Sequence, residues 1–194
     1  SQAGTSVKQD FVELPSQIFE HWATEPEVLR RYARHYETGE VIPDALIEKI
    51  RASSTFNQGF QTSEYLAAAY LDLAWHAQAP DAAADVKALE AAEMDRIGLP
   101  MTIAPRYKST YFQHIFAGDH YSAGYYAYIW AEVLDADGFE AFKEQGLFDP
   151  ATAQSFRQNI LERGGSAEPM SLYRAFRGRD PAVDALLVNR GLAG

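Results

Sequence analysis

The sequence predicts an all-α, multi-helical fold with a bundle-like layout. Prolines stand where the first turns of helices begin, one segment carries apolar residues at a period of 3.6, and strand-type alternation stays short. The sequence also contains no internal repeat. With 194 residues the chain is long enough for one domain and short for two, so we expect a single helical unit over residues 1–194.

Three prolines mark the starts of the first three helices. Pro15 stands in the first turn of PSQIFEHWA, where the missing N–H of proline costs no hydrogen bond. Pro26 begins PEVLRRYARHY, which we expect to end before Gly39, and Pro43 begins a third helix through DALIEKIRAS. In the first of these helices the apolar side chains share one face, namely Ile18, Phe19 and Trp22.

The helix expected over residues 60–78 is the central element of the predicted fold. Its apolar residues recur every three or four positions, and this spacing predicts that their face is buried: Leu66, Ala69, Tyr70, Leu73 and Ala74. No proline or glycine interrupts the stripe, so we expect the other helices to pack around it.

The second half of the chain is also predicted to be helical. QAPDAAADVKALEA indicates an exposed turn followed by an acidic, alanine-rich helix, and IGLPMTIAP interrupts the helical periodicity. Asp180 before Pro181 has the form of a helix cap followed by a first-turn proline. The remaining helices are expected over residues 107–116, 122–136, 138–145, 150–162, 168–176 and 181–190.

The composition excludes several classes of partner. Asp and Glu number 27 against 17 Lys and Arg, so a net charge of −10 argues against nucleic acid or an anionic membrane as a partner. The apolar stretch YLAAAYLDLAW contains Asp72 and is too short to span a membrane. The chain has no cysteine, so any metal site must use His, Asp and Glu. We expect a cytoplasmic protein, with the periplasm as the alternative if a signal peptide precedes this sequence.

Residues 114–128, HIFAGDHYSAGYYAY, concentrate imidazole and phenol groups before an apolar helical run. Tyr121, Tyr125 and Tyr128 lie four and seven positions apart, which predicts that a helix would place them on one face. Gly118 indicates a mobile approach to this helix, as in a loop that closes on a ligand. An aromatic core helix preceded by a plain turn is the alternative interpretation.

A second candidate site is the acidic segment DFVELPSQIFEHW. Glu13 and Glu20 lie seven positions apart, hence on one helical face, and Asp10 stands just outside the helix. Carboxylates that face one way repel each other unless a cation or basic group lies between them. The apolar residues around them indicate partial burial, so the segment is suited to a metal. Solvated surface acids are the alternative.

Five strings follow one another along this chain: DFVELPSQIFEHW, STFNQGFQTSEYLAAAYLDLAWH, YFQHIFAGDHYSAGYYAYIWAEVLDAD, RGGS and FRGRDPAVDALLVNRGL. In this order they closely resemble the C-terminal part of the peptidyl-dipeptidases of the thimet oligopeptidase family of zinc metallopeptidases. The resemblance covers nearly the whole chain. It implies that residues 1–194 are the C-terminal portion of an all-α metallopeptidase catalytic domain.

The resemblance implies a zinc ligand in the acidic segment. In that family two histidines of an H-E-x-x-H helix and one glutamate of the next helix hold Zn²⁺, and Glu13 matches this glutamate. Asp10 or Glu20 is then expected to orient a ligating histidine through a hydrogen bond to the ring nitrogen that does not bind the metal.

The resemblance also implies roles for the aromatic segment. His114 and Tyr128 match residues that stabilise the negative oxygen of the transition state, and Tyr121 and Tyr125 match residues that grip the substrate backbone. Residues 119–120, Asp-His, depart from a loop that is richer in glycine in that family. Because of this departure, the match of Tyr121 to the family residue depends on how the loop is aligned.

The chain lacks the H-E-x-x-H motif, because none of its five histidines begins one: His21, His35, His76, His114 and His120. We therefore expect a C-terminal fragment with one zinc ligand of three and no general base, inactive by itself. Its partners would be short peptide substrates and the missing N-terminal part of the same protein. Apolar surface left uncovered by that missing part is expected to favour a homodimer of the fragment.

Two functions stay open from the sequence. The first is part of a zinc-dependent peptidyl-dipeptidase that releases C-terminal dipeptides from short peptides, with oligopeptidase specificity not excluded. The second is a non-catalytic helical module that binds a peptide or partner. An H-E-x-x-H motif encoded shortly upstream of Ser1 would decide for the enzyme. Elsewhere, the arginines of YRAFRGRD are expected to form ion pairs with the acidic surface, with binding of a substrate carboxylate as the alternative: Arg174, Arg177 and Arg179.

Overall fold

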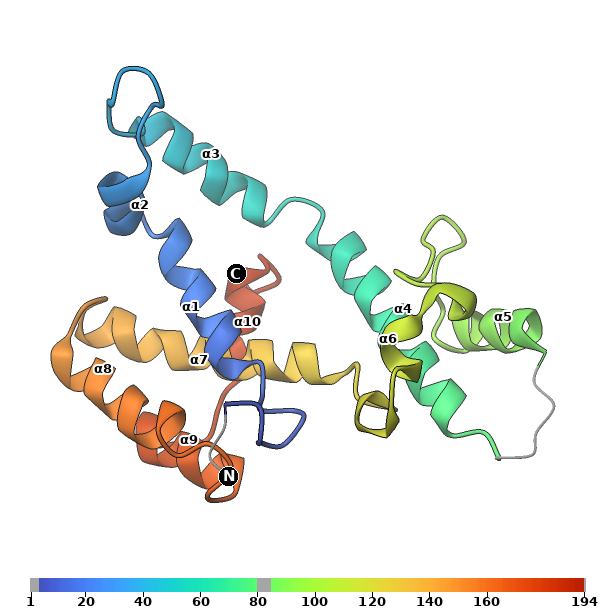
Figure 1. Ribbon diagram of the computed structural model, residues 1–194. Coiled ribbons are helices and arrows are strands. Elements are labelled where there is room, and N and C mark those ends of the chain that lie inside the picture. The colour runs from blue at the N-terminus through green and yellow to red at the C-terminus, as the bar shows by residue number, and fades with distance from the viewer. Residues whose placement is uncertain (1–3, 80–84, 194) are drawn as a thin grey trace. The chain divides into compact units, whose positions relative to one another are not determined.

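The computed structural model describes residues 4–79 and 85–193, and it confirms the all-α class (Figure 1). In these residues β-type pairing is limited to one isolated antiparallel bridge between Arg34 and Val41. The α-helices are α1 (Leu14–Thr24), α2 (Pro26–Tyr32), α3 (Asp44–Ser54), α4 (Gln58–His76), α5 (Val86–Arg96), α6 (Gln113–Phe116), α7 (Ala127–Gln145), α8 (Pro150–Phe156), α9 (Pro169–Arg177) and α10 (Asp184–Asn189). Short 3₁₀ turns η1 (Ser109–Tyr111) and η2 (Asp119–Tyr121) and a π-helical turn η3 (Arg157–Leu161) accompany them.

The chain divides into two compact units. The first comprises residues 1–56 and 129–194, and the second comprises residues 57–128, so the division falls within α7. That residues 1–194 act as a single helical unit stays a prediction.

The core of the first unit joins α1 to α7, α8, η3 and α9. The Trp22 ring on α1 meets the rings of Phe139 and Phe142 on α7 edge to face, at centroid distances of 4.6 and 4.7 Å. Its indole N–H donates to the Leu147 carbonyl at 3.0 Å, so the polar group of this large side chain is satisfied. The buried members of the core are Phe11, Leu14, Ile18, Leu134, Phe139, Phe142, Phe156, Ile160, Leu172 and Tyr173.

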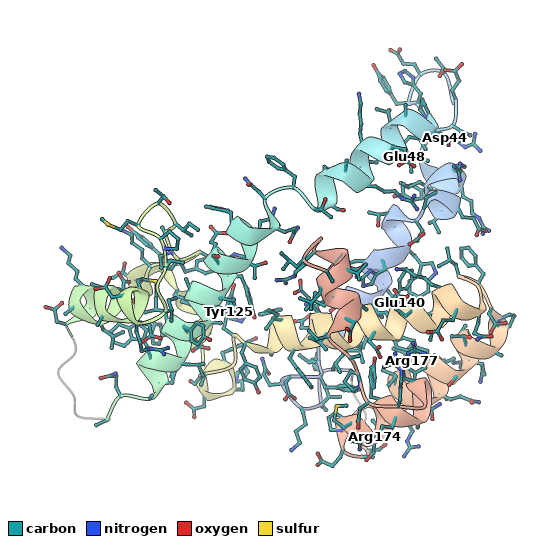
Figure 2. All side chains as sticks on the ribbon, turned by 180° about the vertical axis from the view of Figure 1, so that it is seen from behind. Asp44, Glu48, Tyr125, Glu140, Arg174 and Arg177 are labelled. Carbon is teal, nitrogen blue, oxygen red and sulfur yellow. The ribbon has the colours of Figure 1, made fainter. Side chains whose placement is uncertain are left out.

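Buried charge links α7 to α9 in this unit. Asp137 on α7 is 2% exposed, accepts a hydrogen bond from the Tyr173 hydroxyl at 2.6 Å, and pairs with Arg179 at 2.5 Å. Arg177 donates to the Asp137 carbonyl and binds Glu144 at 2.6 Å. Together with the Arg174–Asp180 pair, these contacts confirm the expected ion pairing of the YRAFRGRD arginines, two of which are labelled on α9 in Figure 2.

Gly138 does not end a helix, although the sequence predicted two helices over 122–136 and 138–145. The structure has one helix, α7, running through it. A Cβ at this position would lie 3.3 Å from Ile18 Cδ1 and 3.5 Å from Phe176 Cε1. The glycine therefore permits close packing of neighbouring elements, a role that sequence periodicity does not distinguish from a helix break.

In the second unit many of the buried residues lie on α4, and the predicted inner face of this helix was wrong in part. Ala69 is buried as expected, but Tyr70 and Leu73 are 39% and 41% exposed. The buried face instead includes Tyr65 and Asp72, whose polar groups bind other parts of this unit. The hydrophobic period located the helix, but the polar contacts of these two residues set which face turns inward.

Side-chain hydrogen bonds connect α4 to η1 and α5. The Trp75 indole N–H donates to Ser109 Oγ at 2.7 Å, and the Ser109 N–H donates to Glu90 at 2.6 Å. Asp85 caps α5 by accepting from the N–H groups of Lys87 and Ala88, as an aspartate at this position should. The turn expected before α5 includes residues 80–84, which lie outside the described residues.

Several predicted helices are shorter than expected. The second ends at Tyr32, because the following chain turns back to form the Arg34–Val41 bridge. The helix expected over 107–116 is two short pieces, η1 and α6. The helix expected over 181–190 begins only at Asp184, and Asp180 binds Arg174 instead of capping it.

The Tyr173 hydroxyl should contribute measurably to stability. In a Tyr173→Phe variant the buried Asp137 carboxylate loses one donor, and we expect the free energy of unfolding to fall by about 1–3 kcal/mol. Urea unfolding of the 194-residue chain measures this change. Tyr36→Phe, at a side chain that is 88% exposed, is the matched control and should have no effect. Equal stability of the two variants would contradict the role given to this hydroxyl.

Candidate active site

The candidate site is built on α4 and the segment that we call the tyrosine loop, residues 117–126. Asp72 on α4 is fully buried and accepts hydrogen bonds from two backbone N–H groups of this loop: Ala123 at 3.0 Å and Tyr125 at 2.8 Å. Tyr65, seven residues earlier on α4, donates its hydroxyl to the Tyr125 carbonyl at 2.6 Å. Residues seven apart share a helix face, so one face of α4 binds both polar backbone groups of Tyr125. Figure 2 labels Tyr125 beside α4.

His76 completes the surroundings of the Asp72 carboxylate. Its Nδ1 lies 2.7 Å from Asp72 Oδ1, one helical turn further along α4. The Ala123 N–H is also 3.2 Å from this nitrogen. Because an Nδ1–H that donates to Asp72 cannot also accept, we assign the Ala123 hydrogen bond to the carboxylate.

The structure brings all four predicted aromatic residues together. The His114 ring centroid lies 4.7 Å from that of Tyr121, 5.8 Å from Tyr125 and 6.1 Å from Tyr128. The Tyr128 hydroxyl lies 3.5 Å from His114 Nε2, at the outer limit of a hydrogen bond. We call these four residues the His–Tyr cluster.

The cluster does not form in the way that the spacing predicted. Tyr121 belongs to η2 and Tyr125 to the turn before α7, so Tyr128 is the member that lies on α7. The single helical face expected for the three tyrosines is therefore wrong. Asp72 and Tyr65 bind the loop in a non-helical conformation, and the rings meet through that conformation instead.

Tyr125 is the buried member of the cluster, with 7% of its surface exposed. Its ring stacks on Tyr65 at 5.5 Å and meets Phe112 edge to face at 4.9 Å. Burial raises the pKa of its phenol above 10.0, although the nearby Arg106 guanidinium partly opposes this shift. The hydroxyl is therefore a neutral hydrogen-bonding group at physiological pH.

The predicted metal ligand lies in the first unit. Glu13 is the residue that precedes α1, and its Oε2 accepts a hydrogen bond from Ser16 Oγ at 2.6 Å. Glu20 is exposed on α1, and Asp10 lies in the turn before it. Across residues 4–79 and 85–193, the structure contains no group of three His, Asp or Glu side chains able to hold a metal. The described residues therefore do not form a complete metal site. Glu13 is the single metal ligand that the family resemblance predicts among them.

A His–Asp pair in the first unit also binds α1 to α7. His21 Nε2 lies 2.6 Å from Asp135 Oδ1, and the imidazole stacks on Phe139 at 4.7 Å. Burial raises the pKa of the Asp135 carboxyl, while the hydrogen bond to His21 acts in the opposite direction.

Asp72 and Tyr65 bind the loop of the candidate site, and the sequence did not single them out for that role. The available signal was an acidic residue inside an alanine-rich apolar stretch, because a buried carboxylate needs donors from elsewhere in the fold. Those donors are backbone N–H groups about fifty residues away along the chain. No local pattern encodes that pairing.

Comparison with known proteins identifies the class of protein to which this all-α chain and its His–Tyr cluster belong. The family model described as peptidase family M3 matches residues 1–192. The chain therefore belongs to peptidase family M3, which confirms the resemblance to the thimet oligopeptidase family.

Several curated proteins are similar over nearly the whole chain. Dipeptidyl carboxypeptidase of Escherichia coli is 47% identical over 98% of this chain, and oligopeptidase A of the same organism is 44% identical over 98%. Saccharolysin of Saccharomyces cerevisiae is 32% identical over 96%. The chain spans 28% of the length of the two E. coli relatives and 26% of that of saccharolysin. No helix in the described part of the chain is long and apolar enough to cross a membrane.

The raised pKa of Tyr125 gives a test of its burial. Above pH 10 the unfolded chain loses this phenolic proton before the folded chain does, so the free energy of unfolding falls as the pH rises. In Tyr125→Phe this contribution is absent, and we expect a shallower decline of stability between about pH 9 and pH 11. Denaturant unfolding at several pH values measures the slope. Tyr111→Phe, at a side chain that is 78% exposed, should keep the steeper slope; identical slopes in both variants would contradict the burial.

Proposed function

We propose that this chain is the C-terminal part of a zinc-dependent peptidase that releases C-terminal dipeptides from short peptides. The observation that carries the proposal is the His–Tyr cluster, in a chain that belongs to peptidase family M3. The proposed dipeptide release follows the similarity to dipeptidyl carboxypeptidase, at 47% identity; oligopeptidase A, at 44%, supplies the alternative specificity. We also propose a cytoplasmic location.

His114 and Tyr128 are proposed to stabilise the transition state. Attack of water on a peptide carbonyl leaves a negative charge on the carbonyl oxygen, and hydrogen-bond donors that point at this oxygen lower the barrier. The Tyr128 hydroxyl and His114 Nε2 are 3.5 Å apart, so one oxygen placed beside both can accept from both. Both groups are partly exposed, as residues that meet a substrate must be.

Tyr121 and Tyr125 are proposed to bind the substrate backbone. Tyr121 is partly exposed and its ring adjoins both His114 and His120, at 4.7 and 4.2 Å. Tyr125 is buried to 7% exposure, so its contact with a substrate would be confined to a small edge of the side chain. Its larger contribution is to support the ring of Tyr128, which meets it at 5.4 Å.

Glu13 is proposed as the zinc ligand that this chain contributes. Its hydrogen bond from Ser16 holds one carboxylate oxygen and leaves the other for a metal. When bound, zinc acidifies a water molecule and polarises the carbonyl that is attacked. The other ligands and the general base are proposed to come from the remainder of the protein. Asp10 or Glu20 is proposed to orient a ligating histidine.

Tyr128→Phe should lower activity in the full-length protein that contains this sequence. Loss of one donor to the developing oxyanion should reduce kcat by about 10²–10³-fold with a smaller change in KM. Release of the C-terminal dipeptide from a short blocked peptide measures the rate. Tyr36→Phe is the control and should retain full activity, because that side chain is 88% exposed in the first unit. Full activity of the Tyr128 variant would remove it from the mechanism.

The 194-residue chain by itself should neither hold zinc tightly nor cleave peptides, because a catalytic zinc site normally uses three protein ligands. The test incubates the purified chain with zinc and the same blocked peptide. Turnover that a chelator abolishes, and that Glu13→Ala also removes, would refute the expectation. If the full-length protein binds the peptide but never cleaves it, the non-catalytic binding module becomes the better description.

A further inference from the structure

We propose that Asp72 is a positioning residue for the reaction: through backbone hydrogen bonds it sets the conformation of the tyrosine loop, and thereby the places of Tyr121, Tyr125 and Tyr128. Tyr65 assists it from the same face of α4. This inference rests on the proposed peptidase function, since it concerns the geometry of the same cluster. Asp72 touches no reacting atom and acts through the tyrosines.

Asp72 and Tyr65 on α4 bind different backbone groups of the tyrosine loop. Asp72 Oδ1 accepts the Ala123 N–H at 3.0 Å, and Oδ2 accepts the Tyr125 N–H at 2.8 Å. The Tyr65 hydroxyl donates to the Tyr125 carbonyl at 2.6 Å. The N–H and the C=O of Tyr125 are thus both bound by side chains of one rigid helix. Rotation of the backbone at Tyr125 would break at least one of these bonds.

The burial of Asp72 makes its hydrogen bonds hard to replace. The side chain is fully buried, so water cannot reach the carboxylate to replace a hydrogen bond that is lost. His76 Nδ1 lies 2.7 Å from Oδ1 and forms a hydrogen bond with the Asp72 backbone carbonyl at 2.9 Å, so this ring also packs against the carboxylate. A carboxylate without these donors would be unstable in this environment, so the loop and the helix require each other.

Ala123 shows that the loop conformation needs such support. Its φ of 55° lies in the left-handed region, which costs an alanine roughly 1–2 kcal/mol relative to its preferred conformations. The Asp72 hydrogen bond to the N–H of this residue offsets that cost. If the bond is lost, the backbone at 123 is expected to relax, and Tyr121 and Tyr125 lie two residues away on either side.

The alternative is that Asp72 contributes to folding stability alone. A conservative substitution at Asp72 distinguishes a positioning role from a purely structural one by which parts of the protein it changes. A positioning residue affects the loop amides and kcat while α4 stays folded, whereas a purely structural residue affects the whole unit equally. Asp72→Asn keeps the side-chain volume and replaces one acceptor oxygen by an NH₂ group, so one loop N–H loses its carboxylate acceptor.

The experiment measures amide hydrogen exchange and peptide hydrolysis in the full-length protein. In Asp72→Asn we expect the amides of Ala123 and Tyr125 to exchange about tenfold faster or more, while the amides of α4 keep their wild-type rates. We expect kcat to fall by about tenfold or more, with KM changed by less than about threefold. Asp95→Asn, at an exposed position on α5 of the same unit, is the matched control and should change none of these values.

Wild-type exchange at both loop amides in Asp72→Asn would overturn the inference, as would faster exchange spread equally over α4. If Asp72→Asn fails to fold, Tyr65→Phe decides, because it removes the donor to the Tyr125 carbonyl and keeps the aromatic ring. Faster loop exchange and lower kcat support the inference, and wild-type values overturn it. A wild-type protein without peptidase activity would refute the proposed function instead. The loop exchange rates would then decide by themselves whether Asp72 fixes the loop.

Discussion

The arrangement of the second unit depends on the need of one buried carboxylate for hydrogen-bond donors. Asp72 has no exposed surface, so its carboxylate is tolerated because two backbone N–H groups donate to it. Those N–H groups belong to the tyrosine loop, which would otherwise have little reason to adopt a left-handed residue at Ala123. The cluster around His114 follows from this constraint, because the loop supplies two of its rings and leads into the third.

The first unit uses buried acids in a related way. Asp135 and Asp137 stand two residues apart on α7 and bind different partners: the former pairs with His21 on α1, and the latter with Tyr173 on α9. A single helix thereby fixes the position of two others through charge-assisted contacts. Buried polar networks of this kind discriminate between alternative packings more sharply than apolar contacts do, because a misplaced partner leaves an unpaired charge. Helix α1, which Glu13 directly precedes, is among those bound in this way.

The sequence predicted where most helices lie but not which faces they bury. Proline at positions 15 and 26 located two helix starts correctly, because its restrictions are local. The inner face of α4 was misassigned at Tyr70 and Leu73. The spacing of apolar residues carries no information about hydrogen-bond donors that come from distant parts of the chain and bind Asp72. The family resemblance predicted that His114 lies near the tyrosines. The prediction that the three tyrosines share one helical face was wrong. The roles of Glu13, Asp10 and Glu20 stay predictions.

The left-handed backbone at Ala123 limits how this loop can change in evolution. Glycine adopts that conformation without steric cost, and asparagine or aspartate tolerates it, whereas β-branched side chains are strongly disfavoured there. Substitution at position 123 should therefore be restricted to a small set of residues even though the loop is partly exposed. Residues 119–120, which are exposed and lie before the bound segment, face no such restriction. Divergence within the family can thus alter the outer part of the loop while its inner part keeps one backbone path.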